Sequence, residues 1–189
     1  MPAAITTYRR PGREGVTVEQ LRRPEAVDLA QGFLQLILSS YAQFEGLDRP
    51  LPEGTLAADR YNPKKPEHVA QMAARIRSHI ALGSQYSVIR QPRKPLKLIA
   101  FAKVTEPGVV DNPYNDRNAL YLNDIMTRPD APGVTYRHQG FGSMVMHAAL
   151  GTGHDPNRPV VLEGFLDNLT FYYPGLKVII TNAFGILEF

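Results

Sequence analysis

Apolar residues recur at helical spacing in two stretches of the N-terminal half. The first stretch opens at Pro24 and runs to about Phe44, and the second opens at Pro66 and ends near Gly83. Apolar positions three and four residues apart form one face of an α-helix. Proline suits the first helical turn, because the N–H that it lacks would be unpaired there. The pattern therefore predicts two amphipathic helices, separated by a proline-rich surface loop over residues 47–66.

Shorter apolar runs, bounded by proline, glycine or polar residues, predict strands. They cover residues 5–8, 86–89, 96–104, 119–127, 159–165, 177–181 and 185–189, and residues 92–95 form the turn between the second and third of them. A third helical pattern at positions 144–149 ends at Gly151 and Gly153, and a short helix is expected over residues 167–173. Elements in this order, with the last two strands as a hairpin, indicate the α+β class.

The composition is that of an ordinary globular chain. With 189 residues, 43% hydrophobic and 21% charged, the sequence suits one domain with a single core and excludes wholesale disorder. The chain has no cysteine, which excludes disulfides, thiolate metal sites and cysteine nucleophiles. Its five histidines lack the spacing of a ligand set, so no metal is expected. Neither an apolar run of about 20 residues nor a signal-peptide pattern occurs, so we expect a cytoplasmic protein without a membrane partner.

The charge pattern argues against nucleic-acid binding. The formal net charge is only +3, and the basic residues are spread along the chain. Nucleic-acid-binding proteins usually present a clustered basic face with stacking aromatic residues. We therefore expect no nucleic-acid partner, whereas a small positive excess is consistent with an anionic cofactor.

The segment most informative about function precedes the third helical pattern. It reads Arg137-His138-Gln139-Gly140-Phe141-Gly142, followed by Ser143. Glycines let a backbone approach a phosphate closely, and a helix N-terminus adds unpaired N–H groups and a partial positive charge. The segment predicts a pyrophosphate cradle, although a tight turn into a helix also explains it. It fits neither a dinucleotide-binding G-x-G-x-x-G, because residue 145 is valine, nor a P-loop, because no Gly-Lys-Ser/Thr occurs.

The order of strand, proline, loop, Arg-x-x-Gly-x-Gly and helix resembles the GNAT acetyltransferase superfamily. The β-prone run Ala119–Thr127, Pro129 and the motif at residues 137–142 carry the resemblance, which extends loosely from about Leu96 to Leu176. It implies a mixed, mainly antiparallel central sheet with helices on both faces and a splayed strand pair. Acetyl-CoA would be the co-substrate, with its diphosphate on Arg137, His138, Gln139, Gly140, Phe141, Gly142 and Ser143 and its pantetheine arm on Ile125, Met126 and Thr127. The spacer from Pro129 to Arg137 is longer than the family usually shows.

The resemblance also suggests catalytic residues. Asn123 stands where a catalytic Glu is often found, and an amide accepts no proton, so Asp124 is the candidate general base. In a regular strand the two side chains point to opposite faces, so either Asp124 serves, a bulge re-aims it, or water carries the proton. The segment at residues 167–176 resembles a later family motif, which implies that Asn168 contacts the cofactor arm and that Tyr172 or Tyr173 faces the thioester sulfur. Tyr172 is favoured, because Phe171-Tyr172 matches the Phe-Tyr pair of the family. Packing roles for these side chains remain open.

The sequence therefore predicts one GNAT-like domain over residues 1–189. Residues 1–95 form the acceptor side, 96–176 the cofactor-binding core and 177–189 the C-terminal strands. We expect an acetyl-CoA-dependent N-acetyltransferase that uses direct attack by an amine in a ternary complex. The alternatives are a non-catalytic acyl-CoA-binding or regulatory module of the same fold and a scaffolding domain. The acceptor is open, and the C-terminal strand would either pair in a homodimer or edge its own sheet.

Overall fold

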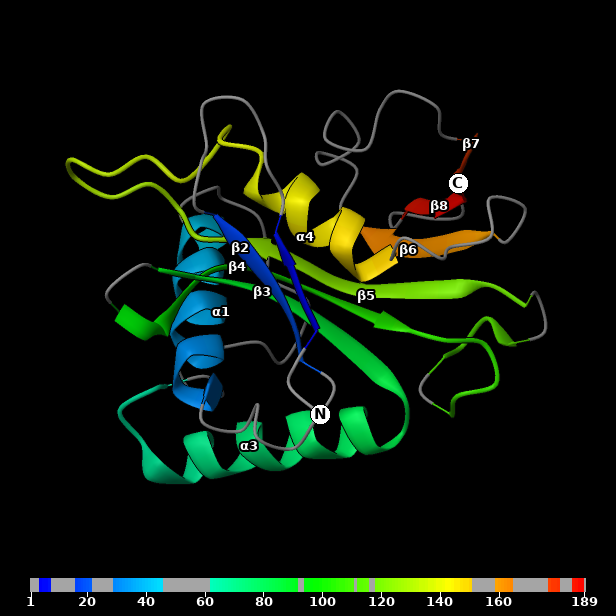
Figure 1. Ribbon diagram of the computed structural model, residues 1–189, viewed down its shortest axis with the longest axis horizontal. Coiled ribbons are helices and arrows are strands. Elements are labelled where there is room, and N and C mark those ends of the chain that lie inside the picture. Colours follow the sequence, from blue (N-terminus) through cyan, green and yellow to red (C-terminus); the bar gives the residue numbers. More distant parts are fainter. Residues whose placement is uncertain are drawn as a thin grey trace.

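The structure is a computed structural model of the 189-residue chain. It describes residues 4–7, 16–21, 29–45, 62–91, 94–110, 112–115, 118–150, 159–164, 177–180 and 185–188. Within these ranges the chain forms one mixed sheet with helices on both of its faces (Figure 1).

Three helices lie in the described part of the chain: α1 (Ala30–Glu45), α3 (Pro66–Ala81) and α4 (Phe141–Leu150). The prediction for α3 is confirmed, with Pro66 in its first turn and Gly83 just beyond its end at φ +98°. The described part of the first expected helix is confirmed over Ala30–Glu45. The expected start at Pro24 lies outside the described residues. No helix among the described residues is both long and apolar enough to cross a bilayer.

Eight strands form the sheet within the described ranges, in the order β1-β2-β3-β4-β5-β6-β8-β7. All neighbouring pairs are antiparallel except β5 and β6, which are parallel and joined through α4. The bounds are β1 (Ala4–Thr7), β2 (Thr17–Leu21), β3 (Ser84–Gln91), β4 (Lys94–Thr105), β5 (Leu120–Thr127), β6 (Val160–Gly164), β7 (Lys177–Ile180) and β8 (Gly185–Glu188).

The comparison with the expected strands brings three corrections. β2 was not expected, because its residues Thr17, Glu19 and Gln20 are polar; the buried Gln20 Nε2 donates 2.6 Å to the Ala148 carbonyl of α4. Residues 94 and 95, expected in a turn, already belong to β4. The expected C-terminal hairpin is confirmed, but β8 lies between β6 and β7, so the last strand is not an edge of its sheet.

The two faces of the sheet carry separate apolar clusters. On one face, α4 packs Val145 and Ala148 against strand residues such as Ala102 and Leu122. On the other face, α1 and α3 pack with Phe101, and Phe33 makes edge-to-face contacts with both Tyr86 and Phe101. Burial of these side chains is the main driving force that holds the helices to the sheet.

Strands β5 and β6 diverge. Their pairing covers only Leu120–Leu122 against Val160–Leu162, so the described residues of β5 from Asn123 to Thr127 have no strand partner on the β6 side. On the other side β5 stays paired with β4 as far as Thr127. The splayed strand pair expected from the sequence is therefore present, and it opens toward the C-terminal end of β5.

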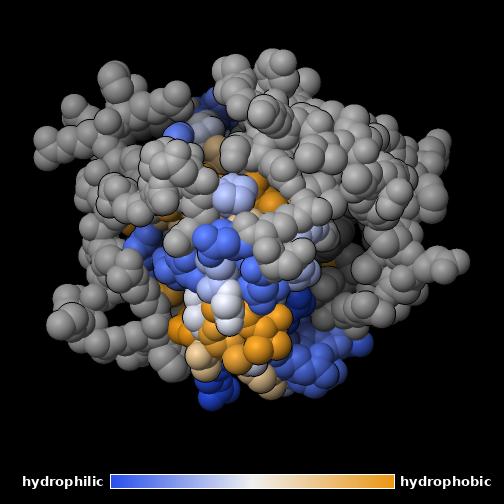
Figure 2. All heavy atoms as spheres, turned by 90° about the vertical axis from the view of Figure 1, so that its right-hand side faces the viewer, coloured by the Kyte–Doolittle hydropathy of each residue, from blue (hydrophilic) through white to orange (hydrophobic). Residues whose placement is uncertain are grey.

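Apolar surface gathers at the opposite end of the molecule, where α3 passes into β3. Figure 2 shows this end, with apolar atoms set among hydrophilic ones. Leu82 is 41% exposed and Val110 is 84% exposed, and a Cβ on Gly83 would meet the Val109 side chain at 3.1 Å. This surface is remote from the opening between β5 and β6.

Candidate cofactor and acceptor site

The first turn of α4 lies at the end of the sheet where β5 is paired with β4 and no longer with β6. Strand β5 ends at Thr127. The chain then returns through an extended loop, residues 129–137, which we call the finger, into α4, which runs antiparallel to β5 (Figure 1). The N-terminus of α4 therefore lies at the end of β5 where the strand has parted from β6. This arrangement brings the predicted diphosphate segment and the predicted pantetheine strand together.

The long spacer between Pro129 and Arg137 is an ordered finger. Ala131 and Val134 exchange two backbone hydrogen bonds of 3.0 and 2.9 Å, and Gly133 has φ +74° at the turn. Such a turn needs a residue that tolerates positive φ. At its base, the buried Tyr136 packs into the apolar cluster beneath α4. The finger is thus held by backbone hydrogen bonds at its tip and by the buried Tyr136 side chain where it joins the domain.

Asp130 fixes the backbone just before the motif. Its Oδ1 accepts hydrogen bonds from the backbone N–H groups of Tyr136 at 2.6 Å and Arg137 at 2.8 Å. These two donations hold the pKa of Asp130 below its ordinary value, with a further contribution from the Arg137 charge. The Arg137 amide is therefore occupied by the protein itself, so a diphosphate role for Arg137 rests on its exposed side chain.

Beyond Arg137, the backbone enters the left-handed region at two positions before α4 begins. His138 and Gly140 have φ +55° and +76°, and the first helical hydrogen bond runs from Met144 N to Gly140 O. In the described part of the chain, the amides of His138, Gly140 and Ser143 donate to no protein acceptor. Alternation of left- and right-handed backbone followed by a helix N-terminus forms a concave set of N–H groups suited to an anion.

A bulge in β5 decides where its polar side chains point. Lys103 of β4 pairs with Asp124, but the next residue, Val104, pairs with Leu122, so Asn123 is the extra residue. Asn123 Oδ1 accepts 2.7 Å from Thr105 Oγ1, and Asp124 lies in a pocket beside Phe101. Residues 101, 103 and 105 of β4 point to the same face of the sheet, the one covered by α1 and α3. The side chains of Asn123 and Asp124 therefore both lie on that face. The expectation that they point to opposite faces holds only for a regular strand, and the bulge corrects it.

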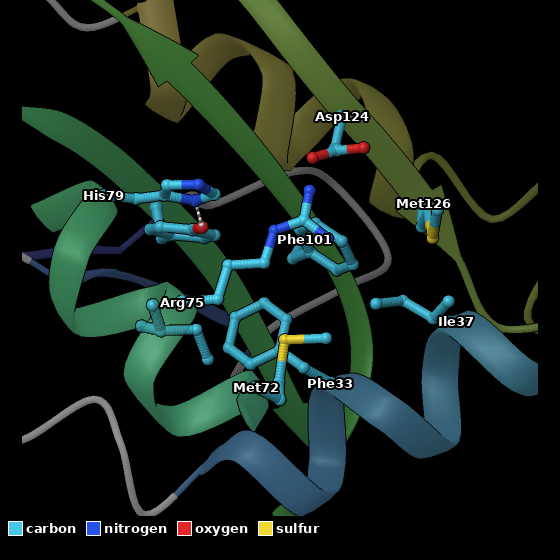
Figure 3. A pocket seen from close by; sticks show the side chains of 10 residues that line it. Phe33, Ile37, Met72, Arg75, His79, Phe101, Asp124 and Met126 are labelled. Carbon is cyan, nitrogen blue, oxygen red and sulfur yellow. Dashed lines mark hydrogen bonds between the residues drawn. The ribbon is translucent and has the colours of Figure 1, made fainter. Parts of the chain in front are cut away.

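The pocket that contains Asp124 lies between the sheet and helices α1 and α3 (Figure 3). Its volume is about 110 Å³. The apolar part of its wall consists of Phe33, Ile37, Met72, Ile76, Phe101 and Met126. Its polar part consists of Asp124, Arg75, His79 and Tyr86, and His79 Nδ1 is hydrogen-bonded to the Tyr86 hydroxyl at 2.7 Å. The cavity thus has charged groups at one end and hydrocarbon at the other.

Electrostatics in this pocket favour a protonatable carboxyl. Burial raises the pKa of Asp124, and the nearby cations Lys103 and Arg75 lower it by less. The net effect raises the pKa of Asp124 toward neutral pH, and a general base is most effective when its pKa is near the working pH. Figure 3 shows the Arg75 side chain extending from α3 with its guanidinium pointing toward the Asp124 carboxylate.

The predicted site residues fall into three groups. The first group follows along β5, where Asn123 and Asp124 lie at the bulge; only Asp124 and Met126 line the pocket, and Ile125 packs on the α4 face. The second group, residues 137–143, forms the loop before α4 and its first turn. Asn168, Tyr172 and Tyr173 lie outside the described residues. Sequence reasoning missed Asp130 and Arg75, since a carboxylate in a loop and an arginine on a helix carry no local pattern that marks them. Among the described residues, no three His, Asp or Glu side chains are grouped as metal ligands.

The fold was compared with known proteins. No protein-family model matches the sequence, and no curated protein matches it either. Among solved structures, the PaiA N-acetyltransferase of Thermoplasma acidophilum, in complex with coenzyme A, matches with a TM-score of 0.58 at 16% identity, over 90% of this chain and 97% of that one. A GNAT-family acetyltransferase of Listeria monocytogenes matches with a TM-score of 0.53 at 13% identity, over 93% and 96% of the two chains.

An acetyltransferase of Thermus thermophilus matches with a TM-score of 0.53 at 11% identity, over 88% of this chain and 92% of that one. These matches cover nearly the whole of each chain, whereas the identities are low, so they establish the architecture. The chain has the fold of the GNAT-family N-acetyltransferases, as the resemblance in its sequence indicated.

Proposed function

We propose that this protein is an acetyl-CoA-dependent N-acetyltransferase that transfers the acetyl group directly to an amine in a ternary complex. The observation that carries the proposal is that three features meet along the C-terminal half of β5. The open edge of β5 on the β6 side, the turn of positive-φ residues at the start of α4 and the pocket lined by Asp124 and Met126 all adjoin this half of the strand. The coenzyme A held by the PaiA N-acetyltransferase, which shares the fold, supports the choice of cofactor.

In this proposal the cofactor binds through backbone groups. The amides from His138 to Ser143 hold the diphosphate, aided by the positive end of the α4 dipole and by the exposed Arg137 side chain. The backbone of Ile125, Met126 and Thr127, free on the β6 side in the described chain, pairs with the amides of the pantetheine arm. An extended ligand that adds to an open strand edge gains main-chain hydrogen bonds without needing particular side chains.

The chemistry needs a base on the acceptor side. The acceptor ammonium gives a proton to Asp124, directly or through a water molecule, and the neutral nitrogen attacks the thioester carbonyl. The new C–N bond forms as the C–S bond breaks, and the departing thiolate takes a proton from a tyrosine hydroxyl, for which Tyr172 or Tyr173 is the candidate. The nitrogen of the adduct carries one proton more than the amide, and it gives this proton back to the tyrosinate, while Asp124 releases its own proton to water. The raised pKa of Asp124 fits a group that accepts and returns a proton.

One observation supports the alternative, a non-catalytic acyl-CoA-binding module. Asn123 replaces the expected Glu, and its carbonyl oxygen is occupied by Thr105. Under this alternative the same cofactor site binds CoA and Asp124 has no chemical role.

Two measurements test the proposed function. Calorimetry with CoA reports cofactor binding, and thiol release from acetyl-CoA across a panel of amines reports turnover. We expect CoA to bind and at least one amine to be acetylated. The variants Asp124→Asn and Tyr172→Phe are compared with the wild type for turnover and CoA affinity. A large loss of rate in at least one variant with unchanged CoA affinity supports the mechanism. CoA binding without turnover on any amine would favour the binding module, and no CoA binding would reject both.

A further inference from the structure

The pocket beside Asp124 has opposite charges at its polar end. The carboxylate of Asp124 comes from β5, and the guanidinium of Arg75 comes from α3 and points toward it (Figure 3). No ion pair joins these two groups in the described part of the chain. A ligand placed between them would meet a negative charge on one side and a positive charge on the other, with Lys103 of β4 as a second cation that acts on the Asp124 carboxyl.

Apart from His79 and Tyr86, which are hydrogen-bonded to each other, the remainder of the wall is hydrocarbon. Phe33 and Ile37 of α1, Met72 of α3, Phe101 of β4 and Met126 of β5 line it. The cavity of about 110 Å³ is of the same order as the engineered cavity of about 150 Å³ that binds benzene. It therefore fits a branched aliphatic group and is small for a long or polycyclic one. Met72 and Met126 add adaptable surfaces that accommodate more than one shape.

We propose that the acceptor is an α-amino acid with a medium-sized apolar side chain, whose amine lies at Asp124 and whose carboxylate is bound by Arg75. This inference rests on the proposed function and names its substrate class. An α-amino acid carries an ammonium and a carboxylate on one carbon, so its head group complements the two charges of the pocket. A guanidinium fork binds a carboxylate through two parallel hydrogen bonds, which also fixes the orientation of the amine.

The same charges disfavour other classes of amine. A polyamine would bring a second ammonium close to the Arg75 cation at the wall of a small cavity, and like charges repel. An amine without a carboxylate would leave the Arg75 guanidinium without its ligand. A peptide N-terminus has a neutral carbonyl where the free amino acid has a carboxylate, so it would form a weaker, uncharged hydrogen bond with Arg75.

The test compares three acceptors of one shape: L-leucine, L-leucinamide and 3-methylbutylamine. Acetyl transfer is measured as thiol release from acetyl-CoA, and L-leucine is also titrated by calorimetry into CoA-saturated protein. We expect kcat/KM for L-leucine to exceed that for the other two by about tenfold or more, the scale of a charge-assisted hydrogen bond. In Arg75→Met this preference is lost through a higher KM for L-leucine, and Arg75→Lys restores part of it.

Arg77→Met is the matched control, because Arg77 is exposed on the same helix, does not line the pocket and lies two residues along α3, on its other side. Arg77→Met should keep the preference. If the two amines without a carboxylate react as well as L-leucine, the inference is wrong while the acetyltransferase function stands. If CoA binds but L-leucine neither reacts nor binds, the inference is also wrong. If CoA itself does not bind, the proposed function fails, and the inference falls with it.

Discussion

Thr105 donates a hydrogen bond of 2.7 Å from its hydroxyl to the side-chain carbonyl of Asn123. The bond spans β4 and β5 at the bulge that turns Asp124 into the pocket. Ser84 is hydrogen-bonded to the same Thr105 hydroxyl at 3.0 Å and, because Thr105 gives its proton to Asn123, Ser84 is the donor. A side-chain network of three residues thus holds the extra residue of β5 in place.

Replacing Thr105 by valine should disturb catalysis without disturbing cofactor binding. Thr105→Val leaves the Asn123 oxygen without its partner, at a cost of about 1–3 kcal/mol in stability. We expect kcat to fall with CoA affinity unchanged, because the proposed cofactor contacts lie further along β5 and on α4. Ser84→Ala is the control, since it keeps the Thr105–Asn123 bond and should leave kcat near the wild-type value. Equal losses in both variants would show that the Asn123 bond does not position Asp124.

Asp124→Asn should abolish turnover and stabilise the protein at neutral pH. Burial raises the pKa of Asp124 in the folded state above its unfolded value of about 3.9. Between those two values the folded state keeps a proton that the unfolded state has lost, so wild-type stability falls as pH rises through the folded pKa. Asparagine carries no such charge, and each kcal/mol gained raises the Tm by about 2–4 °C for a chain of this size.

The measurement is the Tm of both proteins against pH. The difference should be present at neutral pH and vanish below about pH 4, where Asp124 is protonated in both states. A variant no more stable than the wild type at any pH would contradict the assignment of a raised pKa.

Gly140→Ala should weaken CoA binding more than it weakens the fold. Gly140 has φ +76°, a conformation that costs a residue with a Cβ about 1–2 kcal/mol, and in the proposed site the new methyl group would face the diphosphate. Gly133→Ala is a matched control, because Gly133 has φ +74° with open space around it at the finger tip. Thermal melts should show similar losses of stability, whereas calorimetry should show weaker CoA binding in Gly140→Ala alone. Equal CoA affinities in the two variants would place the diphosphate elsewhere.

We expect Asp130 to support CoA binding by accepting hydrogen bonds from the loop backbone, and not through its negative charge. Asp130→Ala removes the acceptor of the Tyr136 and Arg137 amides, and we expect CoA affinity to fall by about three- to tenfold. Asp130→Asn keeps an oxygen there and removes a negative charge near the diphosphate, so its CoA affinity should equal or exceed that of the wild type. The measurement is calorimetry with CoA, and weaker binding by Asp130→Asn would reject this reading.

The pH dependence of the same contact has the opposite sign to that of Asp124. The pKa of Asp130 is lowered in the folded state, so its contribution to stability is present above the unfolded value of about 3.9 and is lost as pH falls through the folded pKa. The amide resonances of Tyr136 and Arg137 should therefore keep their folded positions down to a pH below about 4. Loss of these positions already above about pH 5 would contradict the contact.

The sequence predicts most of the fold because its elements have strong local patterns. The spacing of apolar residues in α3, and the continuous apolar run of β4, each point to one kind of element. Strand β2 escaped prediction because its polar residues are satisfied by tertiary contacts, such as the bond from Gln20 to α4. Its place depends on partners far along the chain, which no local window contains.

The geometry of the candidate site was predictable for the backbone and not for the side chains. Gly140 and the helix that follows could be predicted from the sequence, because a glycine next to an apolar helical pattern marks a turn into a helix start. The bulge at Asn123 was foreseen only as one of several possibilities, since a register shift depends on how β4 pairs with β5. Arg75 joins Asp124 only because α3 packs across that face of the sheet.

The most direct test of the proposed cofactor site is an amide-resolved NMR titration of the protein with CoA. We expect saturable binding, with the largest chemical-shift changes at the backbone amides of residues 138–143 and of Ile125 to Thr127, and small changes on α3. Absence of binding, or shift changes that leave the start of α4 and the open edge of β5 unaffected, would contradict it.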